Sequence, residues 1–199
     1  MLNWTFIFYV GLIVFILLCG VLFFIRSQRQ KTELRLIAAE FGTKVCVKAG
    51  MSSFNIEFER DGIVYKSSIT IPKHGAAFVL NFYLPQFNEK FFIRQNSPFA
   101  SLRAGVNESR FSQPVSVANL SDKYLIHSPN PDFSKELLTN KAILEEINSL
   151  DSVFNYPQIW FDDGHFQIRL VSTGWNLPGK FRHLCRAAIS FHNGIKQLS

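Results

Sequence analysis

Three side chains that could do chemistry stand close together near residue 162. Asp162, Asp163 and His165 surround the dipeptide Asp163-Gly164. Two carboxylates beside an imidazole could bind a metal ion or move a proton. An Asp-Gly pair is also what a tight hairpin turn requires, because both turn residues must tolerate a positive φ. Since adjacent Asp side chains on such a turn are expected to point apart, the sequence favours a structural turn over catalysis or metal binding.

A second set of possible metal ligands lies near the C-terminus. His183 and Cys185 are two positions apart in an expected helix, so they point about 200° away from each other and cannot hold one ion together. His183 and His192 could share a helix face, but a zinc site would need two further ligands. We therefore expect solvent-exposed helix histidines, and the sequence predicts no metal and no cofactor.

The remaining chemical motifs are absent or weak. Cys19, Cys46 and Cys185 are widely separated and form no CxxC pair, which favours reduced thiols over a zinc ribbon or a disulfide framework. The chain has no GxxxxGK[ST], GxGxxG, GxSxG or HExxH motif, so no catalytic residues are predicted. Trp160, Trp175 and Phe161 could line a pocket, although aromatic residues in a chain with 21 Phe are usually core residues.

The run from Trp4 to Ile25 contains no charged side chain and reads WTFIFYVGLIVFILLCGVLFFI. As a helix it would reach about 33 Å, which matches the hydrocarbon core of a bilayer. A cleaved signal peptide is disfavoured because the start is neutral, the apolar core is long and no A-x-A-like site follows. A lipidated cysteine needs a small residue before it, but Leu18 precedes Cys19. We expect a permanent, single-pass transmembrane helix.

Positive charge follows this run at once, in the residues Arg26, Arg29, Lys31 and Arg35. The positive-inside rule retains such a flank in the cytoplasm, so we expect Met1 outside and the C-terminal domain inside. The formal net charge is +6, and the excess is concentrated between Arg26 and Lys48. This basic segment favours lipid headgroups of the bilayer as a partner over nucleic acid, which usually requires a denser patch interleaved with exposed aromatics.

Alternation of apolar and polar residues predicts strands after a helix that runs to about Phe41 and stops at Gly42. Phe54, Ile56 and Phe58 alternate with polar neighbours, as in a half-buried strand. The turn Asp61-Gly62 then predicts a hairpin that pairs Phe58 with Tyr65 and Glu57 with Lys66. A second hairpin around Asp163-Gly164 pairs Phe161 with Phe166 and Ile159 with Ile168. Further strands are predicted at Phe78–Tyr83, Lys90–Gln95, Gln113–Ala118 and Lys123–His127.

Three helices are predicted in the last third of the chain. Asp132 could cap a helix through Leu138, and a second helix spans Lys141 to Leu150. A C-terminal helix opens at Pro178-Gly179 and runs to about Gln197. The order of these elements predicts the α+β class: one N-terminal transmembrane helix, then an antiparallel sheet with helices packed on one side. We expect the anchor with its basic extension at 1–42 and a single domain at 43–199.

The order of these parts resembles that of uncharacterised bacterial membrane-anchored proteins with one span and an α+β cytoplasmic domain. The likeness is carried by LIAAEFG (Leu36 to Gly42), LSDKYLIHSPNPDFSKELLTN (Leu120 to Asn140) and the segment from IWFDDGHFQIRL through Ile195. The resemblance implies an α+β fold on a membrane stalk at a bacterial inner membrane. It implies no activity, and no functional residue follows from it.

Two functions are compatible with these features. The first is a non-catalytic interaction or assembly module, an accessory subunit whose partners are other membrane or membrane-bound proteins. The second is a binding domain for lipid or another hydrophobic ligand, with a pocket between the sheet and the C-terminal helix that is filled from the nearby membrane. An enzyme would need a cleft with at least two titratable groups of shifted pKa, which the sequence does not indicate.

Overall fold

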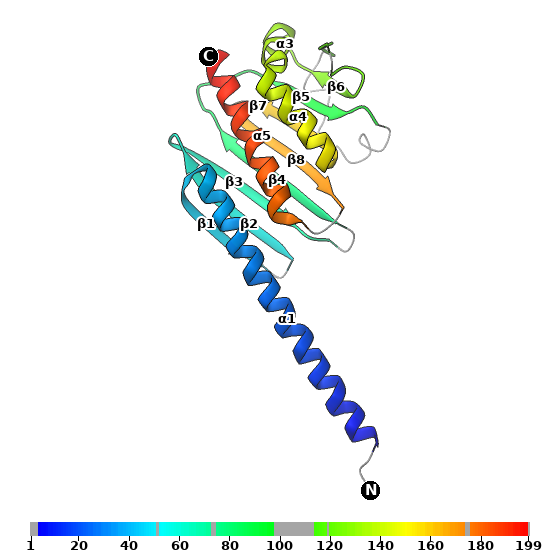
Figure 1. The fold of residues 1–199 in the computed structure, drawn as a ribbon. Helices are drawn as coiled ribbons and strands as arrows, with labels where there is room; N and C mark the ends of the chain where they lie inside the picture. Colours follow the sequence, from blue (N-terminus) through cyan, green and yellow to red (C-terminus); the bar gives the residue numbers. More distant parts are fainter. Residues whose placement is uncertain are drawn as a thin grey trace.

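The computed structural model describes residues 4–50, 52–72, 75–97, 114–118, 120–173 and 176–198. Within these residues a long apolar helix is followed by one eight-stranded antiparallel sheet and three more helices (Figure 1). The predicted α+β class is therefore confirmed. The helices are α1 (Trp4–Phe41), α3 (Pro131–Thr139), α4 (Lys141–Val153) and α5 (Leu177–Leu198). The strands are β1 (Thr43–Ala49), β2 (Ser53–Arg60), β3 (Ile63–Thr70), β4 (Ala76–Tyr83), β5 (Phe91–Gln95), β6 (Tyr124–His127), β7 (Asn155–Asp162) and β8 (His165–Ser172).

The sheet follows the order β1-β2-β3-β4-β8-β7-β5-β6. Both Asp-Gly turns adopt positive φ at both residues, 52° and 78° at Asp61-Gly62 and 48° and 80° at Asp163-Gly164. This is the conformation that gives a two-residue hairpin loop the twist of its strands. Both predicted registers are confirmed, with Phe58 opposite Tyr65 in the first hairpin and Phe161 opposite Phe166 in the second.

Three of the four further predicted strands are present as β4, β5 and β6. The strand predicted at Gln113–Ala118 is wrong for its described part, where only an isolated bridge joins Pro114 to His127. Gln113 lies outside the described residues. The backbone N–H of Val115 still donates to the carbonyl oxygen of Ile126, but the chain turns at Val117, whose carbonyl oxygen accepts from Leu120 and Ser121, so the pairing ends there.

The caps of α3 and α4 are asparagines. Asn130 caps α3 by accepting a hydrogen bond from the backbone N–H of Phe133 at 3.2 Å, so the prediction that Asp132 is the cap is wrong. Asp132 lies in the first turn instead, where a carboxylate still interacts favourably with the helix dipole. Asn140 caps α4 in the same way through Ala142 at 3.0 Å.

The helices lie on one face of the sheet, with α5 between α4 and the last turns of α1 (Figure 1). The C-terminal turns of α1 belong to the core, because Leu34, Ile37 and Ala38 are 0%, 5% and 0% exposed. Glu40 of α1 also pairs with Arg182 of α5 at 2.6 Å. The apolar part of α1, in contrast, is exposed along its length.

This docking gives the domain two distinct ends. The apolar part of α1 projects from one of them, which we call the near end (Figure 1). The opposite end, where α1 stops and the Asp61-Gly62 turn lies, is the far end. A side-chain hydrogen bond from Arg60 to the carbonyl oxygen of Phe41, at 3.4 Å, ties this turn to the last residue of α1.

Candidate functional site

The carboxylates of Asp162 and Asp163 do not point apart, as the sequence had suggested. Both contact the ammonium of Lys90, with Oδ1 atoms 2.8 Å and 2.9 Å from Nζ. These contacts raise the pKa of Lys90, through the hydrogen bonds to Asp162 and then to Asp163. Because a lysine lies where a cation would have to bind, the pair is a structural ion cluster at the end of the second hairpin. His165 takes no part in it and packs its ring on Tyr83, with centroids 4.5 Å apart.

The C-terminal histidines also have separate roles. His183 is partly buried and lies 2.8 Å from the hydroxyl of Ser149 on α4, through Nδ1. Burial, with Arg186 and Arg182 nearby, lowers its pKa. Cys185 is fully buried, which raises the pKa of its thiol. Among the described residues no group of three or more His, Cys, Asp or Glu side chains could hold a metal ion.

His192 is not the solvent-exposed histidine that the sequence had suggested. Its side chain is 0% exposed, and its Nδ1 is hydrogen-bonded to the hydroxyl of Tyr65 on β3. The Tyr65 ring stacks on Phe58 at 4.9 Å and contacts Phe82 at 5.1 Å, so the pair lies within the aromatic core. Burial raises the pKa of the Tyr65 hydroxyl and lowers that of His192 to about 4, which keeps both groups neutral at pH 7.

Of the three aromatic residues proposed for a pocket, the two that the structure describes lie on opposite faces of the sheet. Phe161 is 0% exposed and belongs to the core, whereas its neighbour Trp160 alternates to the other face of the sheet. Trp175 lies outside the described residues. Large side chains of α5 such as Phe181 and Phe191 are fully buried against the sheet.

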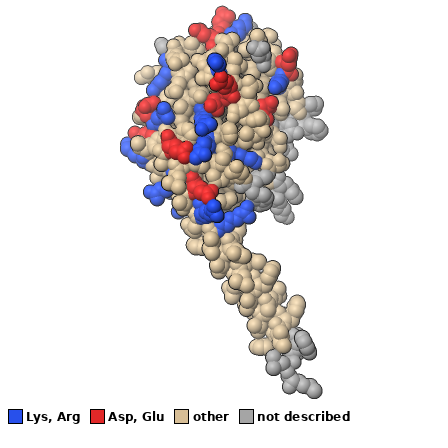
Figure 2. Space-filling model, viewed as in Figure 1, with Lys and Arg blue, Asp and Glu red and all other residues tan. Residues whose placement is uncertain are grey.

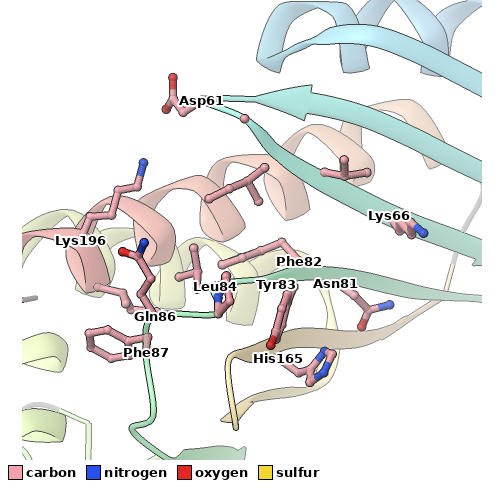
Figure 3. Close-up of a pocket in the computed structure, with 15 residues that line it drawn as sticks. Asp61, Lys66, Asn81, Phe82, Tyr83, Leu84, Gln86, Phe87, His165 and Lys196 are labelled. Atoms are coloured by element: carbon pink, nitrogen blue, oxygen red, sulfur yellow. The ribbon is translucent and has the colours of Figure 1, made fainter.

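A cleft does open at the far end of the domain, between β3 and β4. The β3–β4 ladder ends with Lys66 opposite Asn81, although both strands continue beyond that pair. The strands diverge toward the turn that carries Asp61, as Figure 3 shows. The resulting far-end cleft has a volume of about 940 Å³. Its lining comprises Asp61, Gly62, Ile63, Val64, Lys66, Asn81, Phe82, Tyr83, Leu84, Pro85, Gln86, Phe87, His165, Ile195 and Lys196.

The far-end cleft lies where large hydrophobic side chains of the domain are exposed. Outside α1, the described residues include two large hydrophobic side chains that are strongly exposed, Val64 at 45% and Tyr83 at 48%. Both line the cleft. A small apolar surface concentrated in one concave place is typical of a binding site rather than of random exposure.

The chemistry of the cleft suits binding. Its floor is formed by inward-facing apolar residues of the sheet and of α5, among them Phe82 and Ile195, and its charged residues are Lys66, Lys196 and Asp61. Asp61 lies 3.7 Å from the guanidinium of Arg60, which offsets its charge. Among the described residues that line the cleft there is no Ser, Thr or Cys that could act as a nucleophile. The sequence did not predict this cleft.

Gly164 lies close to Leu84 and Tyr83, two residues that line the cleft, which leads to a test by mutation. A Cβ there would lie 2.7 Å from the carbonyl oxygen of Leu84, whereas a Cβ on Gly62, which has nearly the same φ, would meet nothing within 4 Å. Gly62→Ala should therefore lower the free energy of unfolding by about 1 kcal/mol, because alanine disfavours the left-handed conformation. Gly164→Ala should cost at least about 2 kcal/mol, because the backbone of Leu84 must also move. Denaturant unfolding of both variants measures the difference, and equal losses would show that this close approach is not important.

The four basic residues predicted to lie at a membrane surface are carried by α1. On the face seen in Figure 2, Lys and Arg side chains gather where α1 leaves the domain, and the sequence from Trp4 to Ile25 contains none. Arg29 is paired with Glu33 at 3.0 Å. Lys44 belonged to the same basic segment in the sequence, but α1 carries the chain to the far end before β1 begins, so Lys44 lies there, 2.7 Å from Glu59.

Comparisons of this chain with protein-family models, curated proteins and solved structures found no match. The protein is an α+β domain with a cleft of about 940 Å³ at its far end, and it carries a helix long and apolar enough to cross a membrane.

Proposed function

We propose that this protein is a membrane-anchored, non-catalytic interaction module, an accessory subunit of a membrane complex. The observation that carries the proposal is the continuity of α1. One helix of 38 residues contains both the exposed apolar part and the buried turns at Leu34 and Ala38. A domain that shares its core with its anchor cannot rotate independently of that anchor, so its binding surface is presented in a fixed orientation. That surface is the far-end cleft.

The proposed topology places the segment Trp4 to Ile25 in the bilayer, with Arg26, Arg29, Lys31 and Arg35 at the cytoplasmic headgroups of a bacterial inner membrane. Each basic side chain near an anionic leaflet contributes at most about 1 kcal/mol of attraction. Cys46 is exposed on the edge strand β1 and serves as a reporter of topology. An impermeant maleimide should label it in permeabilised cells only, and labelling of intact cells would overturn the proposed orientation.

A lipid-binding or other hydrophobic-ligand domain is the alternative, because about 940 Å³ is large enough for a small ligand. Two observations favour the interaction module. The cleft opens at the far end, away from the apolar part of α1, so lipid would not enter it directly from the bilayer. The contact between the sheet and α5 is filled by side chains such as Phe181 and Leu184, both 0% exposed.

Affinity purification of the full-length protein from its native membrane in mild detergent tests the proposal. We expect other membrane or membrane-bound proteins in stoichiometric amounts, identified by mass spectrometry. Tyr83→Ala removes an exposed aromatic side chain of the cleft and should reduce their recovery. Leu36→Ala removes a side chain of similar exposure on α1, 63% against 48%, and serves as the matched control. A protein that is purified alone, or with bound lipid only, would overturn the proposal in favour of the alternative.

A further inference from the structure

The divergence of β3 and β4 leaves main-chain groups facing the far-end cleft. In a two-residue hairpin the main chains of the two residues that flank the turn are hydrogen-bonded to each other. The main chain of Ile63 is therefore hydrogen-bonded to that of Arg60, and every second residue of β3 after it is hydrogen-bonded to β2. The residues of β3 that alternate with these, Val64 and Lys66, therefore direct their N–H and C=O groups toward β4. Lys66 is in register with Asn81, but Val64 has no partner in the β3–β4 ladder.

The same alternation applies on the other side of the cleft. His165 flanks the second turn, so its main chain is hydrogen-bonded to β7. The main chain of the next residue, Phe166, is therefore hydrogen-bonded to Phe82 of β4. Asn81 and Tyr83 consequently direct their main-chain groups toward β3. Continuation of the register would place Tyr83 opposite Val64, and the structure does not form that pair. These two residues, Val64 and Tyr83, are also the strongly exposed large hydrophobic residues among the described residues outside α1.

We infer that the far-end cleft binds an extended segment of a partner protein, which adds a short strand along the main-chain groups of Val64, Tyr83 or both. Addition of a strand to unpaired sheet edges is a general mode of peptide recognition, in which main-chain hydrogen bonds give affinity and alternate side chains give specificity. The inference rests on the proposed interaction function and names the class of its partner.

The two faces of the sheet set the sequence pattern of that segment. Successive side chains of a bound strand point to opposite faces. On the inner face they meet the apolar floor of Phe82 and Ile195. On the outer face they meet Lys66 and Asn81, with the exposed side chains of Val64 and Tyr83 beside them. The 4.0 Å contact of Lys66 with Glu57 is long, and its side chain is 66% exposed, so an acidic ligand residue can reach it. The cleft thus fits a segment in which apolar and acidic residues alternate.

Amide hydrogen exchange of the full-length protein in detergent tests the geometry without any ligand. Val64 and Tyr83 should exchange faster than Lys66 and Asn81, the last pair in the ladder. If Val64 and Tyr83 exchange as slowly as Lys66 and Asn81 in the unbound protein, the inference is overturned. The main-chain groups of Val64 and Tyr83 would then already be hydrogen-bonded.

Binding is then measured with three labelled hexapeptides as probes: alternating Val and Glu, alternating Val and Lys, and the Val-Glu peptide with alternate amides N-methylated. We expect only the first to bind and to protect Val64 and Tyr83, with the other two at least about tenfold weaker. N-methylation removes the donors that strand addition needs, whereas Lys places like charges beside Lys66. Equal binding of the N-methylated peptide would indicate a side-chain pocket, and binding of no peptide at millimolar concentration would also overturn the inference.

The double variant Lys66→Glu/Lys196→Glu should reverse the preference from the Val-Glu to the Val-Lys peptide. Its matched control is Lys135→Glu/Lys141→Glu, which makes the same change of charge on exposed residues of α3 and α4 and should leave binding unchanged. Circular dichroism confirms that both fold. If membrane partners still copurify with the Lys66→Glu/Lys196→Glu variant while no peptide binds the native chain, the interaction function stands and this inference fails. Peptide binding without any copurifying partner would instead refute the interaction function alone.

Discussion

Acidification from pH 7 to pH 5 is expected to remove about 2 kcal/mol of the unfolding free energy through His192 alone, rising to about 3 kcal/mol at pH 4. The cause is the burial of the imidazole against Tyr65, where protonation would place a charge in an aromatic core. Burial is the largest effect on the pKa of His192, which falls to about 4. Lys196 and Arg60 lower it further, and Asp61 opposes them.

The sign of this effect follows from the two protonation states. In the unfolded chain His192 titrates near its ordinary pKa of about 6.5. Between that pH and about pH 4 the unfolded state therefore binds a proton that the folded state excludes, and the folded state loses stability as the pH falls. Above about pH 6.5 the full stability is present, because His192 is neutral in both states.

A variant separates His192 from the other groups that titrate in this range. His192→Asn retains a hydrogen-bond acceptor near the position of Nδ1 but cannot be protonated, so its unfolding free energy should change less between pH 7 and pH 5. Denaturant unfolding of both proteins at several pH values measures the two slopes. The same slope in the variant and in the native protein would show that His192 does not carry the acid sensitivity.

Local patterns predicted the hairpins correctly because their causes lie within a few residues. Asp61-Gly62 and Asp163-Gly164 supply the positive φ values, and the period-two alternation around them sets the register, so Phe58 faces Tyr65 as expected. The caps were less accurate, since Asn130 and Asp132 are both good capping residues and only the position of the first turn decides between them.

The far-end cleft could not be predicted in this way. Val64 and Tyr83 read as ordinary strand residues, and the sequence does not show that their strands separate after Lys66 and Asn81. A weak signal exists at Pro85, which lies two residues after the end of β4 and cannot donate to a ladder. The carboxylates of the second hairpin were misjudged for the same reason, because Lys90, the residue before β5, is distant in the sequence and reaches them in the fold.

Burial on the helices was also decided by distant contacts. His192 was expected in solvent because neighbouring residues give no sign of its partner, yet Tyr65 lies 127 residues away in the chain and supplies a hydrogen bond inside the core. Lys44 was grouped with the basic residues of α1 by sequence proximity alone. α1 carries the chain to the far end, so Lys44, at the start of β1, lies away from the apolar part of α1, whereas β1 then brings Lys48 back toward the near end.

The second large effect is expected at Leu34, because the anchor helix contributes to the core of the domain. Leu34 is 0% exposed, and Leu34→Ala should cost about 2–5 kcal/mol as in other large-to-small substitutions in a core. Leu36 lies two positions further along the same helix and is 63% exposed, so Leu36→Ala should change stability by no more than about 0.5 kcal/mol. The two variants remove the same atoms from the same helix and differ only in burial.

Denaturant unfolding of both variants, as full-length proteins in the same detergent, measures this difference. A large loss for Leu34→Ala alone would mean that the last turns of α1 fold together with the sheet and α5. The far-end cleft would then be held rigidly with respect to the apolar part of α1, as the proposed function requires. Similar small losses in both variants would mean that α1 is only tethered to the domain. The cleft could then rotate freely toward the bilayer, and entry of a lipid from the membrane would again be compatible with the fold.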